Sequence, residues 1–294
     1  MAEPRYCYRH PDRETGLSCS ECGRPICVDC MTVAAVGIRC PEHAGSRPRA
    51  VVAASRPASI AGKRVRRTAA RHGYVIPEFS VTRLLVVVNV LVYLAELAGG
   101  GTVNGTNNWI FENGALFGPL VGAGDWWRLI TAAFLHYGPI HLGLNMLALW
   151  WLGQPVEAAL GRIRFILLYL AAGLAGSTGA LLLNFNSVTV GASGAIFGIL
   201  GALLVLEYQV TGSLAGQAMT LIVINVAFSF AISNISIGGH LGGLAAGILG
   251  TVALVAFRRY FPAVGRAGIV RSGAVVAIGV IAVVIAYVKV HSGT

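Results

Sequence analysis

The sequence alternates between long apolar runs and short polar connections over most of its length. One transmembrane helix needs about 20 predominantly apolar residues. After residue 80 the sequence has seven runs of about that length: 81–98, 139–157, 163–183, 193–210, 214–232, 239–257 and 269–289. We therefore predict an all-α polytopic membrane protein with seven spans.

Composition and charge separate the chain into parts. The 294 residues are 55% hydrophobic and 12% charged, whereas soluble domains carry about 25% charged residues. Of 22 Lys and Arg, 13 lie in residues 1–80, as do 7 of 12 Asp and Glu. This pattern excludes a soluble enzyme, a disordered chain and a secreted disulfide scaffold. It predicts an N-terminal domain over 1–46, a basic flexible linker over 47–80 and a transmembrane domain over 81–294.

The N-terminal domain holds all the cysteines, in pairs with the spacing of metal ligands. The four pairs are Cys7-x2-His10, Cys19-x2-Cys22, Cys27-x2-Cys30 and Cys40-x2-His43. Structural zinc sites are closed cages of four such ligands, so eight ligands predict two zinc ions. Three disulfides are the alternative, but they need an oxidising compartment and leave both histidines unexplained. Spacing alone allows either sequential or interleaved sharing of the pairs.

This segment resembles a B-box-type zinc finger. The resemblance implies that the pairs interleave, so that the first and third share one ion and the second and fourth the other. It also implies that the domain binds a cytosolic protein partner and carries no chemistry of its own. Because the segment has few apolar residues, we expect metal binding to supply most of its folding free energy.

The net charge of +10 is explained by membrane topology and gives no indication of nucleic-acid binding. Basic residues favour the cytoplasmic side of short loops and the anionic face of the lipid bilayer. If the N-terminus is cytosolic, one side collects the basic linker and the basic loop residues other than Arg128, which are Arg162, Arg164, Arg258, Arg259, Arg266 and Arg271. Seven spans then place the C-terminus on the external side.

Three polar clusters interrupt the apolar spans. His141 and Asn145 stand four residues apart, on one helix face, and Ser193 opens a later span within Gly-Ala-Ser-Gly. His240 stands near the start of the sixth run, followed by Gly243 and Gly247. Polar side chains in hydrocarbon are costly and usually functional. We predict that Ser193 is a nucleophile and His240 its base.

The acidic residues decide between a triad and a dyad. After residue 157 the one acid is Glu207, which is about 21 Å from Ser193 along a helix that rises 1.5 Å per residue. We therefore expect a Ser-His dyad without a carboxylate. The sequence has no H-E-x-x-H motif and no Asp within a span, which excludes metallo- and aspartyl intramembrane proteases. Catalysis is expected to need no cofactor.

Residues 81–257 resemble a rhomboid intramembrane serine protease. The matching motifs are Trp127-Arg128, His141-x3-Asn145, Gly191-x-Ser193-Gly194 and His240-x2-Gly243-x3-Gly247. The resemblance implies a six-helix core, here followed by one extra C-terminal span. A zinc-binding appendage occurs on some bacterial members, so the expected location is the bacterial cytoplasmic membrane.

The resemblance also assigns roles to residues. Ser193 attacks the scissile carbonyl and His240 takes its proton, while Asn145, His141 and the Ser193 N–H stabilise the oxyanion beside Gly191. Phe197, where family members often have Tyr, packs on the His240 ring. Structural roles fall to residues that hold loops or pack helices: Arg128, Glu157, Gly194, Gly243 and Gly247.

The implied activity is cleavage of membrane-protein substrates within a transmembrane segment, near the external face. A different class is a catalytically silent rhomboid-like protein that only binds transmembrane helices. The simultaneous presence of Ser193 and His240 favours the protease. A transporter is disfavoured because the spans lack paired charges, Pro-broken helices and an internal repeat.

Overall fold

The computed structural model describes residues 5–33, 38–43, 80–103, 107–231, 235–260 and 267–292. The chain divides into two compact units, Met1–Ala69 and Ala70–Thr294. The predicted linker 47–80 lies outside the described residues, apart from Ser80.

The N-terminal unit is built from short elements around a centre of cysteines. β1 (Tyr6–Cys7) pairs antiparallel with β2 (His10–Glu14), and β3 (Thr32–Val33) pairs antiparallel with β4 (Ile38–Arg39). The remaining regular structure among the described residues of this unit is one 3-10 turn, η1 (Val28–Cys30). Ile26 is the fully buried aliphatic residue of this centre and belongs to one cluster with five buried cysteines. So small an apolar core does not hold a fold by itself, which fits a metal-stabilised domain.

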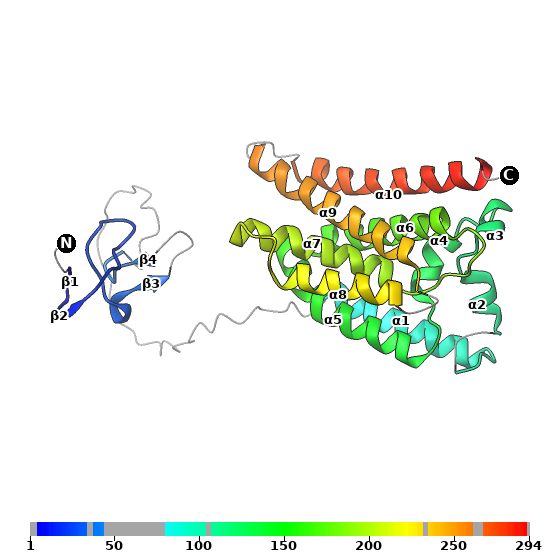
Figure 1. Cartoon of the computed structure of the whole chain (residues 1–294), viewed down its shortest axis with the longest axis horizontal. Helices are drawn as coiled ribbons and strands as arrows, with labels where there is room; N and C mark the ends of the chain where they lie inside the picture. The colour runs from blue at the N-terminus through cyan, green and yellow to red at the C-terminus, as the bar shows by residue number, and fades with distance from the viewer. Residues whose placement is uncertain are drawn as a thin grey trace, which may run out of the picture. The chain divides into compact units, whose positions relative to one another are not determined.

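The second unit is a bundle of long helices (Figure 1). They are α1 (Val81–Ala98), α5 (Pro139–Leu160), α6 (Arg162–Leu183), α7 (Ser193–Thr211), α8 (Gln217–Ala231), α9 (Ile237–Tyr260) and α10 (Ala267–Ser292). Each coincides with one predicted apolar segment, with ends that differ by at most three residues. The all-α polytopic architecture is therefore confirmed.

The number of helices that cross a membrane is a separate matter. Among the described residues, five helical segments are long and apolar enough to do so: Val81–Ala98, Arg162–Leu183, Ser193–Thr211, Ile237–Val255 and Ser272–Ser292. α8 is apolar but has 15 residues. α5 is longer but carries several polar side chains, together with Pro155 inside the helix. Seven spans therefore stay a prediction.

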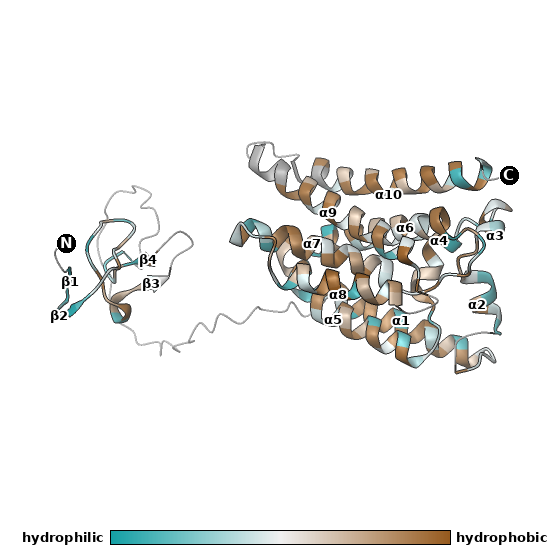
Figure 2. Ribbon diagram, viewed as in Figure 1, coloured by the Kyte–Doolittle hydropathy of each residue, from teal (hydrophilic) through white to brown (hydrophobic). Residues whose placement is uncertain are grey.

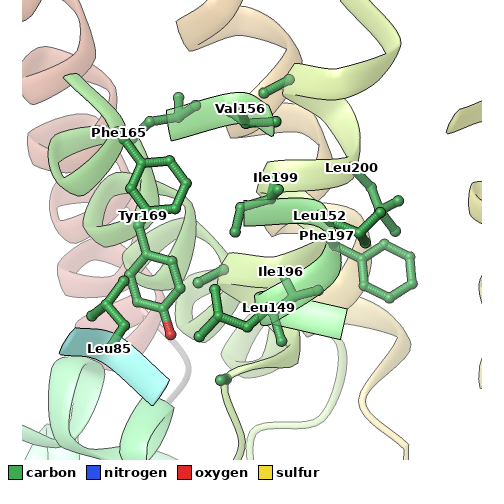
Figure 3. Packing of buried hydrophobic residues seen from close by; sticks show 14 of the residues in the cluster. Leu85, Leu149, Leu152, Val156, Phe165, Tyr169, Ile196, Phe197, Ile199 and Leu200 are labelled. Atoms are coloured by element: carbon green, nitrogen blue, oxygen red, sulfur yellow. The ribbon is translucent and has the colours of Figure 1, made fainter. Parts of the chain in front are cut away.

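The core of the bundle lies where α1, α5, α6 and α7 meet. Leu149 of α5, Phe165 and Tyr169 of α6 and Ile199 of α7 are almost completely buried there, with Leu85 of α1 beside them (Figure 3). Many large apolar side chains are exposed, among them Leu91, Leu147, Ile163 and Val280, and hydrophobic residues predominate along the helices (Figure 2). Outward apolar faces suit a lipid environment, because hydrocarbon rather than water then surrounds them.

The segment between α1 and α5 folds into short helices at one end of the bundle. They are α2 (Trp109–Gly114), α3 (Gly118–Gly122), α4 (Arg128–Thr131) and the 3-10 turn η2 (Ala132–Phe134). The C-terminal end of α10 lies beside them (Figure 1), where Val290 packs with Val121 and Tyr287 stacks on Trp126.

The opposite end of the bundle holds the start of α1. There the Ser80 hydroxyl donates to Glu157, near the end of α5, at 2.8 Å. Glu157 lies one turn before the end of α5, a helix that begins at the short helices. The start of α1 and the C-terminal end of α10 therefore lie at opposite ends of the bundle.

Candidate active site and metal-binding groups

Ser193 and His240 come together at the end of the bundle that carries the short helices. Ser193 is the first residue of α7, and its Oγ lies 2.9 Å from Nε2 of His240, in the first turns of α9. Both residues line a cavity of about 220 Å³. A hydroxyl within hydrogen-bond distance of an imidazole nitrogen is the arrangement of an activated serine nucleophile.

Glycines allow α7 and α9 to approach closely enough for this contact. A Cβ added to Gly243 would overlap the carbonyl oxygen of Gly194, and one added to Gly247 would overlap that of Gly198. In the sequence, small residues stand four apart on each of these helices, at Gly194 and Gly198 on one and at Gly243 and Gly247 on the other, and these two small-residue faces meet. Close backbone packing through small residues is a common way for helices to associate in lipid.

Two further side chains hold the His240 ring. Phe197, one helical turn after Ser193, stacks on it with ring centroids 4.0 Å apart and an interplanar angle of 17°. Ser229 of α8 places its Oγ 2.6 Å from the other ring nitrogen, Nδ1. The first contact is the one expected from the sequence. Sequence reasoning missed Ser229, because it lies in an apolar run without a motif.

His141 lies across the cavity from α9 and is held in one tautomer. The backbone N–H of Tyr137 donates to His141 Nδ1 at 3.3 Å, so a neutral ring carries its proton on Nε2. That nitrogen faces Gly191, whose φ of +123° favours glycine and where an added Cβ would lie 2.8 Å from Nε2. Both the backbone angle and the contact therefore require glycine at 191.

Asn145 is buried on the same face of α5 and lines the cavity with His141. Its Nδ2 donates one hydrogen bond, to the His141 carbonyl oxygen, at 2.9 Å. An amide NH₂ carries two donors. The second N–H is therefore not engaged by a partner among the described residues.

Acidic residues are absent from the described lining of the cavity. Glu207 lies near the other end of α7, where its Oε2 accepts a hydrogen bond from the Ala218 N–H at 3.0 Å. The arrangement agrees with a dyad, as expected from the position of Glu207 in the sequence.

Arg128 and Glu157 make the contacts that structural roles would require. Arg128 donates through one terminal nitrogen to the carbonyl oxygens of Glu112 and Ala115, both at 2.8 Å, and through Nε to Asp125. Glu157 accepts from the Ser80 hydroxyl, from the Val81 and Thr82 N–H groups and from the Thr82 hydroxyl. The first residue ties together the segment between α1 and α5, and the second holds the start of α1.

His136, beside this site, is fully buried with its ring against that of His141. Burial lowers the pKa of His136 to about 3, so its ring is neutral. Neither ring nitrogen has a hydrogen-bond partner among the described residues.

The eight predicted metal ligands form two groups in the N-terminal unit. One contains Cys7, His10, Cys27 and Cys30, and the other contains Cys19, Cys22, Cys40 and His43. This is the interleaved arrangement implied by the B-box resemblance. All six cysteines are free thiols rather than disulfides.

The spacing within each group fits a tetrahedral ion. Zinc bound at about 2.3 Å from sulfur and 2.0 Å from nitrogen separates its ligand atoms by about 3.5 to 3.8 Å. His10 Nδ1 lies 3.3 Å from the Sγ atoms of both Cys27 and Cys30, and the Sγ atoms of Cys22 and Cys40 are 3.9 Å apart. Each group therefore has the ligands and the size for one metal ion.

In each group one thiol, Cys7 or Cys19, ionises more readily than an ordinary cysteine. Burial raises the pKa of the Cys7 thiol, but backbone hydrogen bonds at Cys27 and Arg9 outweigh it and lower that pKa to about 6. In the second group, backbone hydrogen bonds at Cys40 and Cys22 likewise outweigh burial and lower the pKa of Cys19 to about 6. Metal ions bind the thiolate form.

Comparison with known proteins agrees with the helical membrane fold. A bundle of long apolar helices defines a polytopic helical membrane protein. Residues 123–259 match the family model of the Rhomboid domain. The chain is 40% identical over 178 residues to the rhomboid protease GluP of Bacillus subtilis strain 168, a match that covers 59% of this chain and 34% of GluP.

Two further relatives extend the comparison. The putative rhomboid protease YdcA of Bacillus subtilis strain 168 is 39% identical over 135 residues, which cover 44% of this chain and 67% of YdcA. RHOMBOID-like protein 5 of Arabidopsis thaliana is 38% identical over 151 residues, or 48% of each chain. The chain belongs to the rhomboid family and is an integral membrane protein. It spans about a third of the length of GluP.

Proposed function

We propose that this protein is an intramembrane serine endopeptidase that cleaves transmembrane segments of membrane proteins. The observation that carries the proposal is the 2.9 Å contact between Ser193 Oγ and His240 Nε2, in a cavity within an apolar bundle. The family membership and the names of the two Bacillus relatives, both rhomboid proteases, support it.

The first step is attack of Ser193 on the substrate. His240 Nε2 accepts the hydroxyl proton while Ser193 Oγ forms a bond to the scissile carbonyl carbon. The C–N bond of the tetrahedral intermediate then breaks, and the leaving amine takes the proton from His240. Water repeats the sequence on the acyl-enzyme, which releases the acid product and restores Ser193.

The oxyanion of the intermediate needs donors that are in place beforehand. The Ser193 N–H belongs to the first turn of α7, where amides lack partners within the helix and the dipole favours negative charge. Asn145 adds its second amide N–H, and His141 adds the proton on Nε2. We assign these three donors to the oxyanion, with Gly191 leaving room for the His141 ring.

We propose that the N-terminal unit binds two structural zinc ions and recruits a cytosolic protein. Its ligand groups each suit one ion. The domain boundaries 1–46, 47–80 and 81–294 are part of this proposal. No metal takes part in the catalytic step.

We also propose an orientation in the bacterial cytoplasmic membrane. The basic residues place the N-terminus in the cytosol. With seven spans, the end of the bundle that carries Ser193 and the short helices lies on the external side of the lipid bilayer. Cleavage then occurs near that face.

The direct test is cleavage of a fluorogenic reporter that carries one transmembrane segment, by the purified full chain in detergent. Wild-type protein should cleave it, and Ser193→Ala and His240→Ala should not, with unchanged thermal unfolding. A silent helix-binding protein, the alternative class, would bind the reporter and leave it intact in all three cases. Full cleavage by Ser193→Ala would overturn the mechanism.

A further inference from the structure

We propose that Ser229 of α8 is a positioning residue that fixes the tautomer and orientation of His240. The inference rests on the proposed function, since it assumes that His240 is the base. It starts from the 2.6 Å distance between Ser229 Oγ and His240 Nδ1. Both side chains are more than nine-tenths buried.

The direction of this hydrogen bond follows from a second contact. Ser229 Oγ also lies 2.7 Å from the backbone carbonyl oxygen of Asn225, one turn earlier in α8. A carbonyl only accepts, and a serine hydroxyl has one proton to give. The hydroxyl proton therefore goes to the Asn225 oxygen, and the proton shared with His240 comes from Nδ1.

This assignment determines which nitrogen faces Ser193. A neutral imidazole has one proton, so an Nδ1–H leaves Nε2 with its lone pair directed at Ser193 Oγ. The opposite tautomer would leave two acceptors, Nδ1 and the Asn225 carbonyl oxygen, for one hydroxyl proton and would direct an N–H at the nucleophile. The pair Asn225–Ser229 thus selects the tautomer that accepts the Ser193 proton.

Ser229 also supports the charged ring that forms in the reaction. When Nε2 takes the Ser193 proton, the imidazolium still donates from Nδ1 to Ser229 Oγ, and Phe197 still covers its face. In serine hydrolases with a triad, a carboxylate supplies this support. Here the described lining of the cavity holds no acid, and a neutral hydroxyl from a neighbouring helix takes that position.

The local structure of α8 suits such a role. Its buried residues are Ala218, Ile222 and Ser229, of which Ser229 alone has a polar side chain. The remaining side chains of α8 are exposed or partly exposed. Ser229 is therefore the polar side chain of α8 that is buried, and it is buried at the point where it contacts His240.

The test uses pairs of variants that match in shape and differ in the hydroxyl. Ser229→Thr keeps an oxygen at this position, and Ser229→Val replaces it with a methyl group of the same size. With the transmembrane reporter, Ser229→Ala and Ser229→Val should lower kcat about tenfold, the size expected for loss of one buried hydrogen bond. KM should not change, and Ser229→Thr should retain kcat within about threefold.

A fluorophosphonate probe gives a readout that does not depend on the substrate. Its rate of reaction with Ser193 should fall in Ser229→Ala and Ser229→Val and be preserved in Ser229→Thr. Thr220→Val is the control, because Thr220 makes the same kind of intrahelical bond, to Gly216, on an exposed part of α8; it should react as wild type does.

The outcomes separate this inference from the proposed function. Equal losses in Ser229→Thr and Ser229→Val would assign Ser229 to packing and overturn the inference, as would wild-type kcat in Ser229→Ala. Those results would leave the dyad intact, because the dyad is tested separately by the loss of cleavage in Ser193→Ala and His240→Ala.

Discussion

The Cα of Gly243 on α9 packs directly against the backbone carbonyl of Gly194 on α7, so that a Cβ at 243 would overlap that oxygen. Gly194 follows Ser193, and Gly243 lies one turn after His240. This backbone contact lies one residue after Ser193 and three residues after His240. It therefore sets the distance between the nucleophile and the base. Close packing of this kind leaves little freedom for the helices to separate without loss of the 2.9 Å contact.

Gly243→Ala should therefore separate Ser193 from His240. Overpacking a tight contact costs about 1–3 kcal/mol, so we expect lower thermal stability in detergent and loss of most reporter cleavage. Gly273→Ala in α10 is the matched control, since a Cβ there has no neighbour within 4 Å and alanine favours a helix. Wild-type activity in Gly243→Ala would contradict the close packing.

Asn145→Ala tests the oxyanion assignment. Loss of one preorganised donor reduces kcat by about 10²- to 10³-fold, and we expect that reduction with the reporter while binding of the reporter changes little. Asn113→Ala serves as control, because the Asn113 amide makes the same kind of bond, to the Trp109 carbonyl, at an exposed position. Equal kcat values for Asn145→Ala and wild type would remove Asn145 from the oxyanion site.

Much of this arrangement could be predicted from the sequence because apolar length and motif order are local signals. The seven runs predicted the seven long helices, and the small-residue faces beside Ser193 and His240 indicated which helices would meet. The position of Glu207, 14 residues after Ser193, was enough to place it away from the site.

Other features depend on tertiary contacts that leave no local pattern. Ser229 is an isolated serine in an apolar run, and only the packing of α8 against α9 brings it to His240. The stacking of Trp126 on Tyr287 likewise joins residues that are far apart in the sequence and share no motif. Pairing of the metal ligands was open on spacing alone, since both arrangements close equally well; the resemblance to a known zinc finger indicated the interleaved one.

The metal sites can be tested by elemental analysis of the purified full chain. We expect about two zinc ions per chain, at four ligands per ion, and little effect of chelators on reporter cleavage because the dyad uses no metal. Paired variants distinguish the two arrangements. Interleaved sites predict that Cys7→Ser with Cys30→Ser loses one ion and that Cys7→Ser with Cys22→Ser loses both.

Sequential sites predict the reverse pattern for those two double variants. Zinc content near zero in the wild type, with no free thiols, would support disulfides instead. That result would also remove one argument for a cytosolic N-terminal unit.

The orientation is testable with reporters fused to the chain. The described helices begin and finish at opposite ends of the bundle, so a reporter after Thr294 should report the external side when residues 1–80 are cytosolic. A fusion active only in the cytoplasm would contradict seven spans with this orientation, and it would move the proposed active site away from the external face.

The most direct test of the central claim is to locate the adduct of a fluorophosphonate probe by peptide mass spectrometry of the labelled full chain. The probe forms a bond only with a serine whose proton is removed by a base. The account predicts one adduct, on Ser193, and its loss in His240→Ala, with the thermal unfolding of that variant unchanged. An adduct on another residue, or undiminished labelling of Ser193 in His240→Ala, would contradict the account.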